Sequence, residues 1–289
     1  MQFLLNLLTR VQLPVLYAIG RGASFVAYHV LRWRIGIAAT NLRNAFPERS
    51  EAERMTILRQ SYRNLGDLLA ETFHGYAASA DEMRSRVRLE NPEVLTDWTD
   101  RGQSVVLLAA HFCNWEWLLL SASVQLGVPI DAVYKPQHVA FFDRFMRDGR
   151  ARFGGNPIPH RSVMFEIAKR KGQARVYALV ADQTPLREEE KHWTWFLNQD
   201  TAFYVGADKI ARILKAPVLF VTMRREARGR YAARLEVLAL PPYERSAERD
   251  IGALVIERYA RALEAEIREC PADWLWIHRK WKYPKPLYA

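Results

Sequence analysis

The chain has 289 residues, of which 49% are hydrophobic, so it is long enough and apolar enough to fold around a substantial core; intrinsic disorder is excluded. Forty-two Lys and Arg against 32 Asp and Glu give a formal net charge of +10, which favours an anionic partner: nucleic acid, acidic lipid headgroups or an acidic carrier protein. Two isolated cysteines, Cys113 and Cys270, argue against a disulfide-stapled secreted domain and indicate a reducing compartment such as the cytoplasm.

The first 35 residues are apolar, but basic residues interrupt them often enough that no uncharged stretch is long enough for a clean transmembrane helix. A cleavable signal peptide also fits poorly, because the apolar run is broken and no small-residue cleavage site follows. Aromatic residues and a basic flank favour a helix that lies in a membrane interface, and a packed helix hairpin is the alternative. We therefore predict an N-terminal membrane-associating helical segment over residues 1–35 and a single α/β domain over 36–289.

After this segment, Ser50 is typical of a helix N-cap with Glu53 as its capping-box partner, and the helix should run to about Tyr76. From Ser104 onward, short apolar runs alternate with helical patterns. The runs predicted as strands are 104–110, 130–134, 174–181, 216–225 and 231–240. Helices are expected up to about 127, within 141–155, 162–172 and 205–214, and from about 246 to 270. This alternation predicts an α/β fold with a central, mostly parallel sheet flanked by helices, closed by an antiparallel hairpin.

The first strong strand ends at a polar cluster inside an apolar run, "VVLLAAHFCNWEWLLLSA". Ligands of open α/β sheets bind beyond the carboxyl ends of the strands, which makes His111 a candidate for the site. His111 and Glu116 would be turned about 140° apart on one continuous helix. They can approach if His111 lies in the strand-to-helix turn, Asn114 near the cap and Glu116 in the first helical turn. Glu116 would then fix one ring nitrogen and leave the other as a general base for a hydroxyl.

Two other interpretations of this cluster stay open. His111 could be a buried helix-capping histidine, with Glu116 a solvated acid of the first turn. Cys113 could be a nucleophile activated by His111, although neighbouring residues on a turn usually point apart. The remaining histidines show no metal-ligand spacing, so we predict no metal site.

The stretch "AAHFCNWEW" resembles the motif of a histidine, four residues and an acid in glycerolipid acyltransferases of the lysophospholipid acyltransferase superfamily. It resembles more specifically the form found in the bacterial late acyltransferases of lipid A biosynthesis, which transfer lauroyl or myristoyl groups. Four further blocks resemble that family in the right order, so the resemblance covers most of the chain: "TNLRNAFPERSEAERMTILRQSYRNLGDLLAE", "RARFGG", "ADQ" and "WLWIHRKWK".

The resemblance implies a glycerolipid acyltransferase-like fold and the transfer of a fatty acyl group from an acyl-carrier-protein or coenzyme A thioester. The acceptor would be a hydroxyl of an anionic glycolipid, most simply a lipid A precursor. It also implies a peripheral or monotopic location on the cytoplasmic face of the inner membrane, and no cofactor besides the thioester co-substrate. The catalytic pair would be His111 and Glu116. The residues expected to contact substrate are Asn114, Arg150, Arg152, Asp182 and Gln183.

Some of these assignments have plain alternatives. Arg150 and Arg152 could be surface charges, and Asp182 could simply initiate a turn, although it and Gln183 are expected at the same sheet edge as His111. Lys135 stands where the family usually has arginine, and "WTWFLNQDTAFYVG" is looser than the family's usual turn, which puts the acceptor in doubt.

Other functions also stay open. The protein could acylate another membrane lipid, such as a phosphatidylinositol mannoside or an amino-acid lipid, or it could be a thioesterase that uses water as the acceptor. A basic nucleic-acid-binding protein and an inactive membrane scaffold are less favoured, since the chain shows no nucleic-acid motif and keeps the His and Glu pair. The tail 274–282, rich in tryptophan and basic residues, is expected to combine headgroup contacts with a buried tryptophan cluster.

Overall fold

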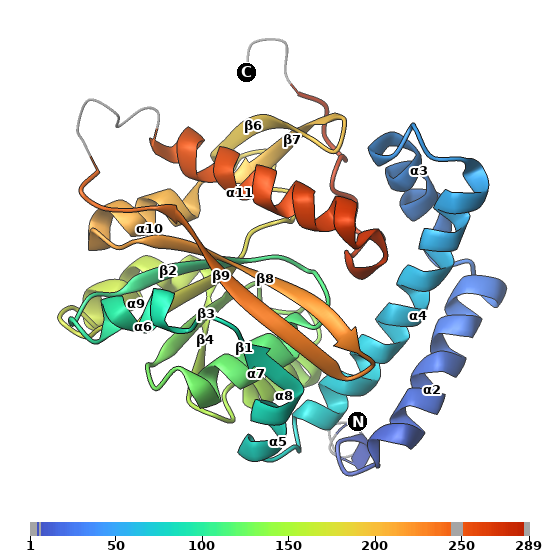
Figure 1. Cartoon of the computed structure of the whole chain (residues 1–289), viewed down its shortest axis with the longest axis horizontal. Helices are drawn as coiled ribbons and strands as arrows, with labels where there is room; N and C mark the ends of the chain where they lie inside the picture. Colours follow the sequence, from blue (N-terminus) through green and yellow to red (C-terminus); the bar gives the residue numbers. More distant parts are fainter. Residues whose placement is uncertain (1–4, 6, 244–250, 286–289) are drawn as a thin grey trace.

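The computed structural model describes residue 5, residues 7–243 and residues 251–285. A seven-stranded sheet occupies the centre, in the order β1-β9-β8-β2-β5-β3-β4 (Figure 1). Every pair of neighbours is parallel except β8 and β9, which form the expected antiparallel hairpin. The strands are β1 Val87–Leu89, β2 Val105–Ala109, β3 Ile130–Tyr134, β4 Gly155–Pro159, β5 Val176–Val180, β8 Val218–Ala227 and β9 Arg230–Ala239. The predicted α/β class with a mostly parallel sheet is confirmed.

Strand β2 lies in the interior of the sheet between β5 and β8, and all five of its residues are buried. A strand covered on both faces is expected to be continuously apolar, which explains why Val105 to Ala109 contains no alternation. The polar cluster that begins at His111 therefore follows the most deeply buried strand of the molecule.

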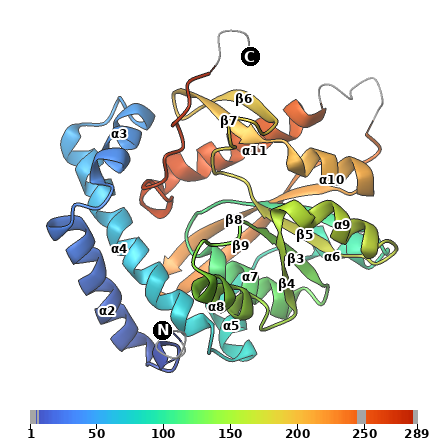
Figure 2. The same ribbon diagram turned by 180° about the vertical axis from the view of Figure 1, so that it is seen from behind.

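Helices cover both faces of the sheet (Figures 1 and 2). Helices α10 and α11 lie on one side, together with a small separate hairpin, and α5, α7 and α8 lie on the other. The bounds are α5 Ala80–Arg86, α6 Glu93–Thr99, α7 Trp115–Gln125, α8 Ala140–Arg150, α9 Val163–Lys169, α10 Gly206–Leu214 and α11 Ile251–Glu269. The predicted helices that correspond to α7, α8, α9, α10 and α11 are confirmed, except that residues 246–250 of the last one lie outside the described residues; α5 and α6 were not predicted.

Several elements were not predicted. Strand β1 has only three residues, and β4 is an edge strand containing Pro157 and Pro159, a residue type that argues against a strand unless it lies at an edge. The stretch interpreted as a loose turn forms the separate hairpin of β6 (Lys191–Phe196) and β7 (Gln199–Tyr204). Its two turn residues, Leu197 and Asn198, both have positive φ, the geometry of a tight hairpin turn that glycine normally signals.

The N-terminal part contains α2 (Leu13–Phe25), a π-helical turn η1 (Val26–Val30) and α3 (Ile35–Ala45), followed by the long helix α4 (Glu51–Gly75). The capping box of Ser50 and Glu53 at the start of α4 is confirmed. Within the described residues, no helix combines the length and the apolar character needed to cross a membrane.

Helix α2 lies along α4 (Figure 1). The contacts run antiparallel, because Tyr17 reaches Glu71, Gly20 reaches Gly66, and Tyr28 reaches Tyr62. At the crossing the two backbones touch: a Cβ atom on Gly20 would lie 2.2 Å from the carbonyl oxygen of Gly66. Only glycine allows so close an approach.

Candidate active site

His111 follows the carboxyl end of β2, and Asp182 follows the carboxyl end of β5, its hydrogen-bonded parallel neighbour. Because the two strands end at the same edge of the sheet, the two side chains meet. Nδ1 of His111 lies 2.7 Å from Oδ1 of Asp182, and the backbone N–H of His111 donates to Oδ2 over 3.0 Å. The predicted placement of Asp182 and Gln183 beside His111 is confirmed.

The environment of Asp182 keeps it ionised. Burial by itself would raise the pKa of this carboxyl, but the neighbouring His111 and the hydrogen bonds from His111 and Trp274 lower it to about 2. An ionised carboxylate can only accept hydrogen bonds, so Nδ1 of His111 carries a proton, and in the neutral ring Nε2 holds the lone pair. Nε2 lies 3.3 Å from the side-chain nitrogen of Gln183, and the imidazole is 18% exposed. Nε2 is therefore the ring nitrogen that can accept a proton, and the Gln183 side chain lies beside it.

Trp274 completes this arrangement, and its contact with Asp182 was not predicted from the sequence. Its indole N–H donates to Oδ2 of Asp182 over 2.9 Å, and the ring is buried. The backbone of the same segment also holds the turn that contains His111: Leu275 donates to the carbonyl of His111, and Cys113 donates to the carbonyl of Asp273. The tryptophan-rich tail is thus largely core, and the available signal was that a buried indole N–H needs an acceptor.

Glu116 does not orient His111. Glu116 lies in the first turn of α7, as predicted, but its carboxylate faces Arg150 at the end of α8, which donates two hydrogen bonds of 2.9 and 2.5 Å. Tyr76 adds a third at 3.1 Å and Trp115 a fourth at 3.2 Å. Burial alone would raise the pKa of Glu116, whereas Arg150 and these hydrogen bonds lower it. The predicted pair of His111 and Glu116 is replaced by the pair of His111 and Asp182.

An indirect link between Glu116 and His111 runs through Trp115. The indole of Trp115 donates to Glu116 and stands edge-on against the imidazole of His111, with ring centroids 4.9 Å apart at 73°. Glu116 therefore fixes a wall of the site and anchors Arg150.

The two predicted arginines differ. Arg150 is largely buried and held in two-point contact with Glu116. Arg152 is exposed, donates to the carbonyl of Ala78 over 3.0 Å and lies over the ring of Phe153. The hydrogen bond of Arg152 joins it to the loop that follows α4.

Asn114 is the N-cap of α7, as its position predicted, and is fully buried. Its Oδ1 accepts from the N–H of Trp117 over 2.9 Å, and its Nδ2 donates to Glu71 over 2.6 Å. Glu71, also buried, accepts further hydrogen bonds from Tyr17 and Tyr231. The expected substrate contact of Asn114 has no exposed surface to support it, and the residue instead joins α7 to α4 and α2.

Cys113 does not face the histidine. It adopts a left-handed conformation (φ 50°) in the turn, and its Sγ lies 3.1 Å from the carbonyl oxygen of Met223. Burial raises the pKa of the thiol, so this group is a poor nucleophile and the alternative of a Cys113 nucleophile is excluded. Among the residues that the structure describes, no cluster of three or more His, Cys, Asp or Glu side chains could hold a metal ion.

Comparison with known proteins decides the family. The family model for bacterial lipid A biosynthesis acyltransferase matches residues 2–283. The chain belongs to this family. It is 27% identical to the lipid A biosynthesis palmitoleoyltransferase of Escherichia coli (strain K12) over 273 residues, 93% of this chain and 85% of the relative. It is 24% identical to the lauroyltransferase of the same organism over 277 residues, 96% and 88% of the two chains.

A lipid A biosynthesis acyltransferase of Haemophilus influenzae is similar as well, with 23% identity over 273 residues. The resemblance based on five sequence blocks is thereby confirmed, and membership of the lipid A acyltransferase family makes the chain an enzyme that transfers acyl groups. Within this family member, the residues with the geometry for such chemistry are His111 and Asp182, with Gln183 and Trp274 beside them.

Proposed function

We propose that this enzyme transfers a fatty acyl group from an acyl thioester to a hydroxyl of a lipid A precursor, with His111 as the general base. One observation carries the proposal: Nδ1 of His111 is fixed by the ionised, buried Asp182, which leaves Nε2 as a proton acceptor at the carboxyl edge of the sheet. The palmitoleoyl, lauroyl and myristoyl transferases among the relatives support the reaction type.

In the proposed step, the acceptor hydroxyl takes the place of Gln183 at Nε2 of His111. The hydroxyl proton moves to Nε2 as the oxygen attacks the thioester carbonyl carbon, so that a C–O bond forms and the C–S bond then breaks. The imidazolium returns its proton to the departing thiolate. Asp182 stabilises the transient positive charge and holds the ring in one tautomer. General-base assistance of this kind is typically worth ~10²–10⁴-fold.

The surrounding groups have supporting roles in this proposal. Trp115 packs against the imidazole and is held by Glu116. Arg150 is already ordered by Glu116, so binding an anionic substrate group would cost little further entropy. Arg152 and Gln183 are the other predicted contacts for substrate, and guanidinium groups suit phosphate recognition.

The proposal also covers the acyl donor and the cellular location of the enzyme. Acyl-carrier protein and coenzyme A are both anionic, in keeping with the net charge of +10. The N-terminal segment exposes apolar side chains, among them Phe25, Val30 and Leu31, which supports its attachment to a membrane surface. We place the enzyme on the cytoplasmic face of the inner membrane, where thioester donors are available.

The decisive experiment follows radiolabelled acyl groups from acyl-carrier-protein or coenzyme A thioesters into a detergent-dispersed lipid A precursor. Wild type is compared with His111→Ala and with His192→Ala as a matched control. Like His111, His192 is partly buried and bonded to a carboxylate, Glu257, over 2.8 Å, but it lies on the separate hairpin. We expect a loss of at least ~10²-fold in kcat for His111→Ala and a change of less than about threefold for the control.

Each other outcome has a definite meaning. Equal activity in wild type and His111→Ala would make the histidine structural and would end the proposed mechanism. Labelled free fatty acid without labelled lipid would show hydrolysis by a thioesterase. Labelling of a phosphatidylinositol mannoside or an amino-acid lipid, but not of the lipid A precursor, would move the acceptor to another membrane lipid.

A further inference from the structure

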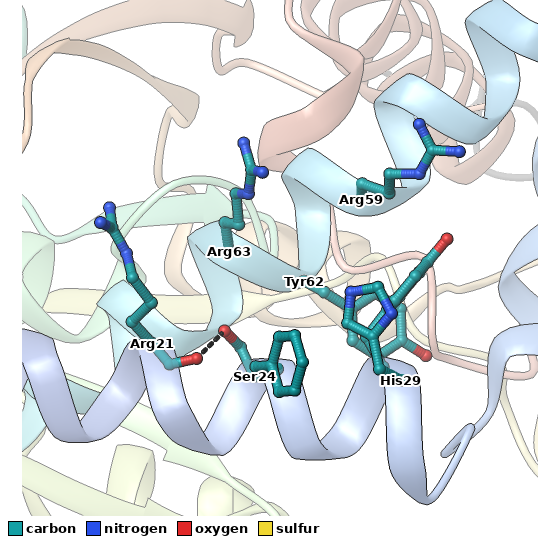
Figure 3. A pocket seen from close by; sticks show the side chains of 8 residues that line it. Arg21, Ser24, His29, Arg59, Tyr62 and Arg63 are labelled. Carbon is teal, nitrogen blue, oxygen red and sulfur yellow. Dashed lines mark hydrogen bonds between the residues drawn. The ribbon is translucent and has the colours of Figure 1, made fainter.

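A cavity lies away from the sheet edge, between α2 with its π-helical extension η1 and the first half of α4. It has a volume of about 350 Å³, and Figure 3 shows the side chains that line it. Arg59 and Arg63 stand one turn apart on α4, and Arg21 faces them from α2. The three guanidinium groups extend to the same side of the helix pair (Figure 3).

No acidic side chain that the structure describes within the cavity neutralises the charges of these three arginines. In most of the chain's ion pairs an arginine is bonded to a nearby acid, as Arg150 is to Glu116 or Arg228 to Asp67. Among the described residues, Arg21, Arg59 and Arg63 have no acidic partner, and the lining of the cavity includes no Asp or Glu. Like charges one helical turn apart repel each other, so an anion bound among them would relieve that repulsion.

The floor of the cavity is aromatic. Tyr28 and Tyr62 meet edge to face with centroids 5.2 Å apart, and Phe25 and His29 lie 4.5 Å apart. Tyr62 is buried and fixed, whereas the outer rim formed by Phe25 is 59% exposed. The chain beyond this rim carries further exposed apolar side chains, at Val26, Val30, Leu31 and Trp33. The arginine-lined cavity therefore adjoins an exposed apolar surface.

We propose that this cavity binds the phosphate of an acidic phospholipid headgroup of the bilayer, as a site separate from the one where acyl transfer takes place. The guanidinium groups match a phosphate diester, and the adjoining apolar residues match the region where acyl chains begin. A free phosphate ion would have no use for the apolar rim, which is why the lipid is the occupant that the surface fits. The proposal involves neither His111 nor the identity of the acyl acceptor.

The site is linked by a short route to α7, the helix that follows His111. Arg63 precedes Glu71 by eight positions on α4, about 12 Å along the helix axis. Glu71 binds both Tyr17 of α2 and Asn114, the cap of α7. A phospholipid held by the arginines would thus fix the helix pair on the membrane while the same pair holds the start of α7.

The test measures partition of the full chain between buffer and vesicles at constant ionic strength, with phosphatidylcholine vesicles beside vesicles that also contain phosphatidylglycerol. The variant Arg59→Gln/Arg63→Gln is compared with Arg161→Gln/Lys171→Gln, which removes the same charge next to α9, on the far side of the molecule (Figure 1). A basic residue at an anionic surface contributes roughly a factor of five in partition, so we expect on the order of a 30-fold loss for the α4 variant. The control should lose less than about threefold, and partition onto pure phosphatidylcholine should not change.

Two additions make the result specific. The variant Arg59→Lys/Arg63→Lys keeps the charge but loses the two-point geometry, and we expect it to keep the larger part of the binding. Inorganic phosphate is added to wild type at millimolar concentration with the ionic strength held constant. Displacement of wild type from the vesicles by this phosphate would assign the cavity to the free ion and overturn the proposal. An equal loss in both Gln variants, or none in the α4 variant, would overturn it as well.

Discussion

Asp182 and Glu116 are both buried carboxylates close to the same turn, yet they end in different chemical situations. Asp182 is bonded to an imidazole whose second nitrogen lies at the surface of the site. Glu116 is bonded to Arg150 through both of its oxygens, and Tyr76 and Trp115 use the remaining capacity. The difference shows that the acid closest to a histidine in sequence is not necessarily its hydrogen-bond partner. The partner is the acid whose strand or helix ends beside the histidine in the fold.

Breaking the first pair should have the largest effect on activity. For Asp182→Asn we expect a loss of ~10²–10⁴-fold in kcat, because the amide can stabilise the tautomer with the proton on Nε2, which cannot accept the hydroxyl proton. Steady-state acyl-transfer kinetics at pH 7 and above would show the loss. A variant with wild-type kcat would mean that Asp182 does not orient the base.

The low pKa of Asp182 also sets a pH dependence with a definite sign. Because the pKa falls from 3.8 to about 2 on folding, the carboxylate contributes stability that is fully present above about pH 4 and is lost as the pH falls through about 2. The free energies of unfolding of wild type and Asp182→Asn, measured between pH 2 and 5, should therefore approach each other as the pH falls toward 2.

Breaking the second pair should act mainly on stability. Glu116→Ala leaves the guanidinium of Arg150 buried without its carboxylate, and we expect the free energy of unfolding to fall by ~3–5 kcal/mol. The double variant Glu116→Leu/Arg150→Met removes both charges and should recover most of that loss. Urea unfolding of the two variants measures the difference. If the single and double variants were equally unstable, the pair would matter through packing and not through charge.

Lys280 is a third buried charged group, and it differs from Asp182 and Glu116 because no group of opposite charge among the described residues is hydrogen-bonded to it. Its Nζ donates to the carbonyls of Ala202 and Gln183 and lies 3.9 Å from the centre of the Phe203 ring. Burial lowers the pKa of Lys280 to about 7, against a smaller opposing effect of Asp182.

The sign of the resulting pH effect follows from linkage. Between pH 7 and about 10.5 the unfolded chain binds more protons at this lysine than the folded chain does, so the contribution of Lys280 to stability rises with pH across that window. We expect the stability of wild type relative to Lys280→Met to increase by a few kcal/mol from pH 7 to 10, since a pKa difference of one is worth about 1.4 kcal/mol. A difference that does not vary with pH would contradict the lowered pKa.

The smallest effect is expected at Gln183. Its side-chain nitrogen lies 3.3 Å from Nε2 of His111, a long hydrogen bond that the acceptor hydroxyl would replace. For Gln183→Ala we expect less than a tenfold change in kcat. A loss as large as that of Asp182→Asn would show that Gln183 acts on the reacting atoms themselves.

The extent to which the site was predictable depends on how far apart in sequence its members lie. His111 and Asp182 follow two continuous apolar runs, and parallel strands bring such positions to one edge, so their proximity could be predicted. Trp274 reaches Asp182 from a segment 92 positions later, and no periodicity connects them. The partner of Glu116 depended on where α8 ends relative to α7, a packing detail that local spacing does not contain.

The fold shows the same division. Long periodic segments such as α4 and buried runs such as β2 and β5 were predictable, because burial on defined faces leaves a pattern in the sequence. Strand β4 contains prolines, which normally argue against a strand, and the β6–β7 turn contains no glycine, which normally marks a tight hairpin turn. In both places tertiary contacts override local preference.

The glycine contact between α2 and α4 limits how this enzyme can be re-engineered. A helix from another protein fused in place of α2 would carry side chains at the crossing, and a single methyl group at position 20 already collides with the backbone of α4. Such a chimera would sit farther out and stretch the Tyr17 hydrogen bond to Glu71. The geometry therefore does not allow α2 to be exchanged freely for another helix. A replacement helix would need glycine at position 20 and tyrosine at position 17, one turn earlier.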